Sequence, residues 1–277
     1  MKRTFTTPEP VTLYVELRAG DVVVHARDTA ETVVEVDGNG ADDAGGVSVD
    51  QRGDDIAVVA LAGRHGFFGS SQQRLSVHVT VPTDSRLTTK LGSADVRAEG
   101  RLGDSLLRSG SGEVRIDELG GEAFLETGSG DVWIATATGA LKVKCGSGGV
   151  SVERLDGPAE ISTGSGDVAI GTANGPVSVK SGSGDTRIRE ASEDVALSTA
   201  SGDLVVDRIQ RGQLTAKNVS GDIKVGVPAG VPVWTDITCM SGTVRSSLDG
   251  AGEPAEGQDF IELRAKTVSG DIVLEQL

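Results

Sequence analysis

The stretch TGSGDVWI at residues 127–134 decides the fold, because close variants of it recur along the chain. TGSGDVAI occupies residues 163–170, SGSGDTRI residues 181–188 and TASGDLVV residues 199–206. Aligned on the residue after each Ser-Gly or related pair, successive positions lie 18 residues apart at Asp95, Glu113, Asp131, Gly149, Asp167, Asp185 and Asp203. The spacing then widens to reach Asp222, Thr243 and Asp271. A constant interval of this length identifies an internal repeat.

Apolar side chains alternate with polar ones inside each repeat. The recurring apolar columns are Val96, Val114, Val132, Val150 and Val168 one residue after the aligned position, Ile116, Ile134, Val152, Ile170 and Ile188 three after it, and Leu107, Leu125, Val143, Ile161, Val179 and Leu197 six before it. A period of two places these side chains on one face of short strands.

Each 18-residue repeat holds two short strands and two Gly-rich corners, which is too little to bury its own apolar face. Stacking equivalent repeats at ~4.8 Å buries a continuous core. We therefore predict an all-β protein in which residues 84–277 form a β-solenoid of two-strand coils, with parallel strands between coils. Stacked β-hairpins with antiparallel pairing would show the same alternation and remain an alternative, and the sequence does not fix the handedness.

Residues 1–83 lack the 18-residue period. They contain the alternating segments VTLYVEL, DVVVHA, TVVEV, DIAVVAL and LSVHVTV, joined by Gly- and Asp-rich turns. An uncapped solenoid end exposes unpaired backbone groups and apolar side chains. We therefore predict that residues 1–83 form a β-meander that caps the solenoid and is continuous with it.

Several motifs carry a resemblance to a known family: AGDV near the start, LGSADVRAEGRLGD at 91–104, the TGSGDV repeats, PVWTDITCMSGTVRSSLDG at 232–250 and the closing TVSGDI. In these motifs the chain resembles the bacterial Toastrack family of β-strand repeat proteins, also labelled "putative adhesin". The resemblance covers nearly the whole chain. It implies a non-enzymatic interaction module, of a kind often encoded with envelope-stress membrane proteins.

Charge and composition exclude several classes of protein. The net charge of −15 argues against a general nucleic-acid binder, which needs a basic face to neutralise phosphates. No apolar run approaches the roughly 18 residues of a membrane span. The opening MKRTFTTPEP lacks the apolar segment of a signal peptide. We therefore expect a cytoplasmic protein that does not insert directly into a membrane.

The Gly-Ser-Gly-Asp corner has three candidate roles: phosphate binding, calcium binding and turning the chain. A phosphate loop needs a Lys and a following helix, whereas an Asp and a strand follow here. In register, Asp167, Asp185, Asp203 and Asp222 would form a ladder that a cation could neutralise, because unit charges ~4.8 Å apart repel by about 1 kcal/mol in water. We favour a structural corner whose carboxylates accept turn N–H groups, since Gly149 and Thr243 occupy the same column without disturbing the period.

The sequence contains no recognisable motif for a catalytic site or for a cofactor-binding site. His25, His65 and His78 match no metal or triad motif, and the carboxylates recur as a repeat feature rather than as the isolated pair of a glycan-cleaving groove. Cys145 and Cys239 lie several coils apart at ~4.8 Å per coil, whereas a disulfide needs Cα atoms within about 7 Å. We predict no enzymatic activity, no catalytic residue and no cofactor.

The segment RHGFFGSS at 64–71 contains two of the chain's five Phe residues, side by side at Phe67 and Phe68. Alternation cannot bury both rings on one sheet face, so they are candidates for contact with a partner, although they could also plug the end of the solenoid. We predict a non-catalytic scaffold that binds a protein partner. Self-association into dimers or filaments is one alternative, and a carbohydrate-binding or glycan-cleaving groove is another.

Overall fold

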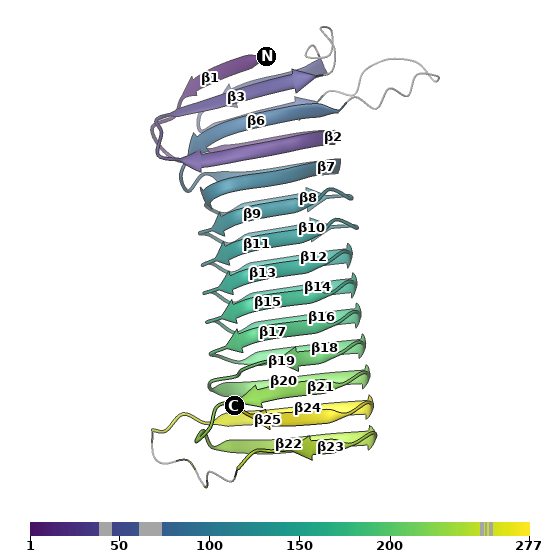
Figure 1. The fold of residues 1–277 in the computed structure, drawn as a ribbon. Coiled ribbons are helices and arrows are strands. Elements are labelled where there is room, and N and C mark those ends of the chain that lie inside the picture. The colour runs from purple at the N-terminus through teal and green to yellow at the C-terminus, as the bar shows by residue number, and fades with distance from the viewer. Residues whose placement is uncertain (39–45, 61–73, 250–251, 253, 255–256) are drawn as a thin grey trace, which may run out of the picture. The chain divides into compact units, whose positions relative to one another are not determined.

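A computed structural model of the chain describes residues 1–277 except residues 39–45, 61–73, 250–251, 253 and 255–256. All of its named elements are β-strands, which confirms the predicted all-β class (Figure 1). The chain forms two compact units, residues 1–139 (unit 1) and residues 140–277 (unit 2). The boundary predicted between residues 83 and 84 stays a prediction.

Unit 2 is built from coils of two strands. The first strands of its coils are β12 (Leu141–Ser147), β14 (Ala159–Ser165), β16 (Val177–Ser183), β18 (Val195–Ser201), β20 (Gly212–Ser220), β22 (Val233–Ser241) and β24 (Ile261–Ser269). The second strands are β13 (Val150–Leu155), β15 (Val168–Ala173), β17 (Thr186–Ala191), β19 (Leu204–Val206), β21 (Ile223–Val227), β23 (Val244–Ser246) and β25 (Ile272–Gln276).

Equivalent strands of neighbouring coils pair in parallel, offset by one repeat. Leu141 lies opposite Ala159 where β12 pairs with β14, and Val177 lies opposite Val195 where β16 pairs with β18. The second strands follow the same rule, with Val150 opposite Val168. The predicted parallel solenoid is therefore confirmed for these coils, and the antiparallel hairpin alternative is wrong for them.

The predicted apolar columns form the core of unit 2. Side chains six residues before the aligned position are almost completely buried at Val143, Ile161, Val179 and Leu197. The polar residues between them point outward and are exposed or half-buried. Because successive side chains of a strand alternate between the two faces, the 18-residue register places like residues on like and keeps one face of the strands from β12 to β21 largely buried.

The order of the last coils differs from their order in the sequence. The sequence suggests that the coil of Thr243 follows the coil of Asp222 directly, with the coil of Asp271 at the end. In the structure, β24 pairs with both β20 and β22, so the last coil of the sequence lies between the other two (Figure 1). The coil made by β22 and β23 is therefore the terminal coil of unit 2.

Unit 1 contains the remaining strands. These are β1 (Lys2–Thr6), β2 (Thr12–Arg27), β3 (Glu31–Gly38), β4 (Val47–Arg52), β5 (Asp55–Ala60), β6 (Leu75–Pro82), β7 (Arg86–Leu102), β8 (Ser105–Ser109), β9 (Val114–Leu119), β10 (Ala123–Thr127) and β11 (Val132–Ala137). From β7 onward the strands follow the 18-residue register, with Val96 opposite Val114 and Val114 opposite Val132.

The first part of unit 1 is more mixed than the β-meander expected from the sequence. Antiparallel pairs join β1 to β3, β3 to β6 and β4 to β5. However, β2 pairs in parallel with β5, β6 and β7. The segments VTLYVEL and DVVVHA fall almost entirely within this one long strand, and Gly20, which lies between them, has a φ of 133° that favours glycine.

Candidate functional site

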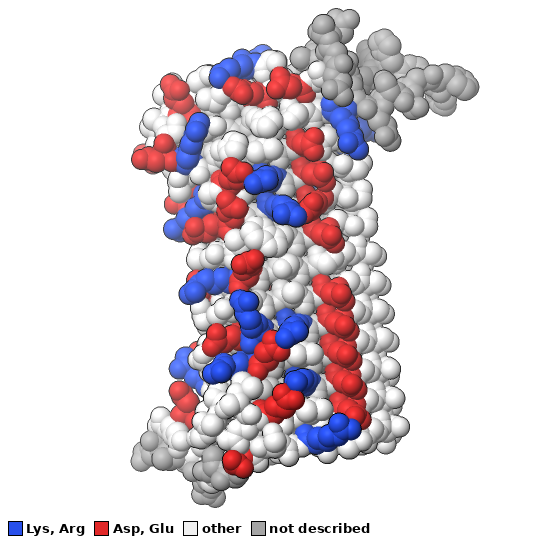
Figure 2. Space-filling view, viewed as in Figure 1, with Lys and Arg blue, Asp and Glu red and all other residues white. Residues whose placement is uncertain are grey.

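The aspartates of the Gly-Ser-Gly-Asp corners hold neighbouring coils together. Oδ1 of Asp167 accepts the backbone N–H of Asp185 at 2.8 Å, and Oδ1 of Asp185 accepts that of Asp203 at 2.8 Å. The series continues through Asp222, and the carboxylates form a red row along one edge of the unit 2 coils (Figure 2). The sequence predicted bonds to each residue's own turn, whereas the structure places them between coils.

A cation ladder at Asp167, Asp185, Asp203 and Asp222 stays the untested alternative to a structural corner. One oxygen of Asp167, Asp185 and Asp203 is already used by the backbone of the next coil. Within the described part of the chain, no group of three or more His, Cys, Asp or Glu residues is placed to hold a metal ion. The corners are therefore best understood as structural features.

Close approach between coils explains the corner glycines. A Cβ atom on Gly166 would lie 2.1 Å from the carbonyl oxygen of Gly148 in the neighbouring coil. Hydroxyl side chains also bond the corners, since Oγ1 of Thr127 accepts the N–H of Gly130 at 3.2 Å. These contacts explain why the motif recurs, because a side chain larger than glycine at the corner would clash with the backbone of the neighbouring coil.

The other residues singled out in the sequence form no common site. Nδ1 of His25 lies 3.0 Å from Glu99 Oε2, and Nε2 of His78 lies 3.0 Å from Ser76 Oγ. Cys145 is buried and Cys239 is half-buried, and neither takes part in a disulfide. His65, Phe67 and Phe68 lie outside the described residues, so the two Phe residues stay a predicted contact.

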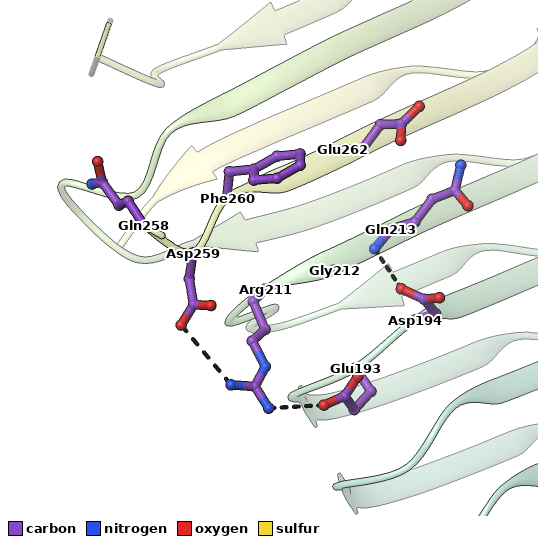
Figure 3. Close-up of a pocket in the computed structure, with 9 residues that line it drawn as sticks. All are labelled: Glu193, Asp194, Arg211, Gly212, Gln213, Gln258, Asp259, Phe260 and Glu262. Atoms are coloured by element: carbon purple, nitrogen blue, oxygen red, sulfur yellow. Dashed lines mark hydrogen bonds and ion pairs between the residues drawn. The ribbon is translucent and has the colours of Figure 1, made fainter. Parts of the chain in front are cut away.

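The structure reveals a different candidate, which we call the Arg211–Phe260 hollow. It has a volume of about 330 Å³ and lies at the corners that precede β18, β20 and β24 (Figure 3). Its lining residues are Glu193, Asp194, Arg211, Gly212, Gln213, Gln258, Asp259, Phe260 and Glu262. Segments from three places in the sequence meet here because β24 lies directly beside β20.

Arg211 is the central cation of the hollow. Its Nη2 donates to Glu193 Oε1 at 2.8 Å, its Nε donates to the carbonyl of Ser192 at 3.1 Å, and its Nη1 lies 3.9 Å from Asp259 Oδ2. The hydrogen bond to Glu193 raises the pKa of Arg211, and the charge of Asp259 adds to this effect. The guanidinium is therefore held in place between two carboxylates from different coils.

The carboxylates of Asp194 and Glu262 form hydrogen bonds with other parts of unit 2. Asp194 Oδ1 accepts the backbone N–H of Gln213 at 2.8 Å and so fixes the corner. Glu262 bonds to Arg264. The lining contains more carboxylates than cations, so the hollow has an acidic character and offers mainly hydrogen-bond acceptors to a ligand.

Two aromatic rings stand exposed beside these charges. Phe260, in the lining, is 49 % exposed, and Trp234 is 55 % exposed on β22. Trp234 lies opposite Glu262 in the strand register, and the Cζ atom of Arg264 is 5.8 Å from its ring centroid. Neither ring was predicted from the sequence as part of a site. Trp234 occupies an outward position of an alternating strand, which was a signal available in the sequence.

A second depression of about 370 Å³ lies on the outer face of β13, β15 and β17. Small residues at Ser151, Ala169 and Gly171 create it, and Arg187 at its rim is held by both oxygens of Asp207 at 2.9 and 3.1 Å. Because it contains no exposed aromatic ring and is explained by missing side-chain bulk, it is the weaker candidate.

The chain matches the model of one known protein family over most of its length. A model of the family described as Toastrack DUF4097 matches residues 12–175 and 171–275. No curated protein matches its sequence. None of the described residues belongs to a helix that could span a membrane.

Solved structures resemble the chain over nearly its full length, at low identity. A "putative adhesin" from Bacteroides fragilis is 12 % identical, with 99 % of this chain and 96 % of that chain covered and a TM-score of 0.39. A "putative lipid binding protein" from Parabacteroides distasonis is 10 % identical, with 100 % and 96 % covered and a TM-score of 0.38. A "putative cell adhesion protein" from Clostridium sporogenes is 11 % identical, with 100 % and 99 % covered and a TM-score of 0.22.

Proposed function

Because this chain belongs to the Toastrack family, we propose that its repeats serve as a rigid, non-enzymatic scaffold that binds a protein partner at the Arg211–Phe260 hollow. The observation that carries the proposal is the half-exposed ring of Phe260, set among the carboxylates of Glu193, Asp259 and Glu262. An exposed ring beside acidic groups fits a partner side chain that has both a positive charge and an apolar stem.

Arginine is the side chain that fits this chemistry best. Its guanidinium can pair with a carboxylate through two N–H groups and can also lie over an aromatic face. Trp234 and Arg264 already show such an arrangement on the neighbouring surface, at 5.8 Å. The net charge of −15 would attract a basic partner over a longer range, and salt would weaken that attraction.

Peptide binding tests the proposal. An Arg-rich peptide and a Glu-rich peptide of equal length would be titrated with the protein by fluorescence anisotropy at low and high salt. We expect binding of the Arg-rich peptide only, weakened by salt and reduced several-fold in Phe260→Ala and in Asp259→Asn. Val219→Ala is the matched control, because Val219 is equally exposed but lies outside the hollow. Unchanged affinity in both hollow variants would contradict the proposed site.

Carbohydrate binding is a second candidate, and one observation favours it. The lining combines a half-exposed ring with carboxylates, a guanidinium and the amides of Gln213 and Gln258. An apolar sugar face could stack on the ring while its hydroxyls donate to the acids and accept from the amides. A glycan array probed with wild type and Phe260→Ala would detect it, and a signal that survives in Phe260→Ala would argue against the hollow.

The cellular compartment of the protein is also part of the proposal. We keep the cytoplasm as the expected compartment and envelope stress or adhesion as the linked system, which rests on family membership. Fractionation of the native cell, followed by detection with an antibody, would test the compartment. Recovery outside the cytoplasm would contradict the expected compartment.

A further inference from the structure

The terminal coil of unit 2 has an open strand edge. Among the strands that the structure describes, β22 pairs with β24 and β23 pairs with β25, and neither has a second neighbour. Every other first strand between β14 and β24 has a partner on both sides. An unpaired edge exposes a row of N–H and C=O groups that can pair with another chain.

The direction of the backbone groups on β22 follows from one hydrogen bond. The carbonyl of Pro232 accepts the N–H of Ile261 at 3.0 Å, so residue 232 faces β24. Backbone groups alternate sides along a strand, and therefore the even-numbered residues up to Met240 also face β24. The N–H and C=O groups of Val233, Thr235, Ile237 and Cys239 consequently point to the open edge.

The core-facing side chains of β22 are less buried than the residues of β24 that lie opposite them. Ile237 and Cys239 are half-buried and Thr235 is exposed, whereas their partners Ala265, Thr267 and Leu263 on β24 are buried. On the outer face, Met240 is 74 % exposed and Trp234 is 55 % exposed. The end of the core is thus open to contact along the whole of β22.

We propose that a second copy of this chain covers this edge, with β22 of the two copies paired antiparallel about a two-fold axis at Ile237. Ile237 is the central residue of Val233–Ser241, so this register uses the full length of the strand. Each residue whose backbone faces the edge then meets another such residue: Ile237 meets its own copy, and Thr235 meets Cys239. The same axis brings Trp234 of one copy against Met240 of the other, twice.

Other registers are less favourable. An axis at Asp236 would place the two Asp236 carboxylates directly opposite each other, and like charges in that position destabilise a sheet. An axis between two residues would set core-facing side chains opposite outward-facing ones. With the axis at Ile237, Asp236 lies opposite Thr238, which carries no charge. Both the charges on β22 and the matching of core-facing side chains therefore favour the axis at Ile237 over these two alternatives.

The terminal coil lacks one of the bonds that link most coils of unit 2, although the coil of Gly149 stacks in parallel on its neighbour without a carboxylate at this position. Asp271 Oδ1 accepts the N–H of Thr243 at 2.8 Å, which continues the bonds between coils. Thr243 itself has no carboxylate with which to accept the N–H of a further coil. A two-fold pair needs no such acceptor and closes after two copies, so the expected assembly is a dimer rather than a filament.

Oligomeric state across a concentration series tests the proposal first. Analytical ultracentrifugation of the full chain should show a monomer–dimer equilibrium. Met240→Lys should weaken the dimer at least tenfold, while Val219→Lys should leave it unchanged. Val219 is the matched control, because it is an exposed residue at the equivalent position of β20, away from the open edge. A wild-type chain that stays monomeric at high concentration overturns the proposal.

Proline placement separates edge pairing from folding. Thr235→Pro removes an N–H that faces the open edge, so it should abolish the dimer and leave the melting temperature of the monomer nearly unchanged. Thr238→Pro removes an N–H that faces β24, so it should lower the melting temperature instead. A dimer that persists in Thr235→Pro would show that β22 is not the interface.

Cysteine cross-linking fixes the register. In a background with Cys145→Ser and Cys239→Ser, chains carrying Asp236→Cys would be mixed with chains carrying Thr238→Cys and then oxidised. Opposed residues without backbone hydrogen bonds lie ~4.5 Å apart, within the range of a disulfide. A mixed cross-link is expected and neither variant should cross-link efficiently alone. Efficient self-linking of Asp236→Cys would place the axis at Asp236 and overturn the proposed register.

Discussion

The carboxylate of Asp222 accepts a hydrogen bond from the backbone N–H of Asp271 at 2.7 Å, although the two residues are 49 positions apart in the chain. This bond joins the coil of β20 and β21 to the coil of β24 and β25. The intervening residues of β22 and β23 are consequently placed at the end of unit 2. The open edge and the Arg211–Phe260 hollow both follow from this order, because each needs β24 beside β20.

Removing one acceptor of the aspartate row should weaken unit 2 modestly. Asp222→Ala leaves the N–H of Asp271 without its partner, and we expect a loss of about 1 kcal/mol in the free energy of unfolding, since the site is exposed. Asp222→Asn keeps an acceptor oxygen and should cost less. Urea denaturation of both variants checks this, with and without calcium. A calcium-dependent stabilisation lost in Asp222→Asn would support the cation ladder instead.

Replacement of a corner glycine should be costly because of contact rather than backbone strain. The Cβ atom of Gly166→Ala would meet the carbonyl oxygen of Gly148 at 2.1 Å, and we expect a loss of about 3 kcal/mol or more. Gly230 provides the control, because it has a φ of 78° but nothing within 4 Å of an added Cβ. Gly230→Ala should cost only about 1 kcal/mol. Equal losses in the two variants would show that coil-to-coil contact is not the reason for glycine.

The alternation of the strands predicts opposite responses to the same substitution. Val179 is 1 % exposed and Val219 is 55 % exposed. Val179→Asp buries an unpaired carboxylate and should cost several kcal/mol or prevent folding. Val219→Asp should change the free energy of unfolding by less than about 0.5 kcal/mol. Circular dichroism melts of the two variants give the comparison, and a stable Val179→Asp protein would be inconsistent with the register.

Much of the fold was predictable because the repeat fixes several properties together. The 18-residue interval sets the register, the alternation sets the buried face, and the glycines mark the corners, as Val143, Ile161 and Gly166 illustrate. The parallel pairing of β2 with β5, β6 and β7 was not predicted, because residues 1–83 lack the 18-residue period that sets the register elsewhere. The strand segments themselves, by contrast, were recognisable from alternation.

The order of the last coils and the candidate site were harder to foresee. The intervals from Asp222 to Thr243 and then to Asp271 look like growing insertions, so the simplest interpretation stacks the coils in sequence order. Thr243 lacks the carboxylate of the aligned position, but Gly149 lacks it too and lies inside the stack, so this substitution did not mark the terminal coil. The hollow depends on that order, since Arg211 and Phe260 meet only when β24 lies beside β20.

Stability at low pH should depend on Asp156. Arg154 donates to its carboxylate at 3.0 Å and Asn174 Nδ2 donates at 2.6 Å, and these bonds hold the pKa of Asp156 below its ordinary value of 3.8. A carboxyl whose pKa is lower in the folded state stabilises the fold above pH 4 or so, and this contribution is lost as the pH falls through the folded pKa. Wild type should therefore lose more stability than Asp156→Asn between pH 7 and pH 3, with Asn174→Ala intermediate. Urea denaturation at the two pH values measures the difference, and parallel losses in wild type and Asp156→Asn would show that this carboxylate contributes nothing to the acid response.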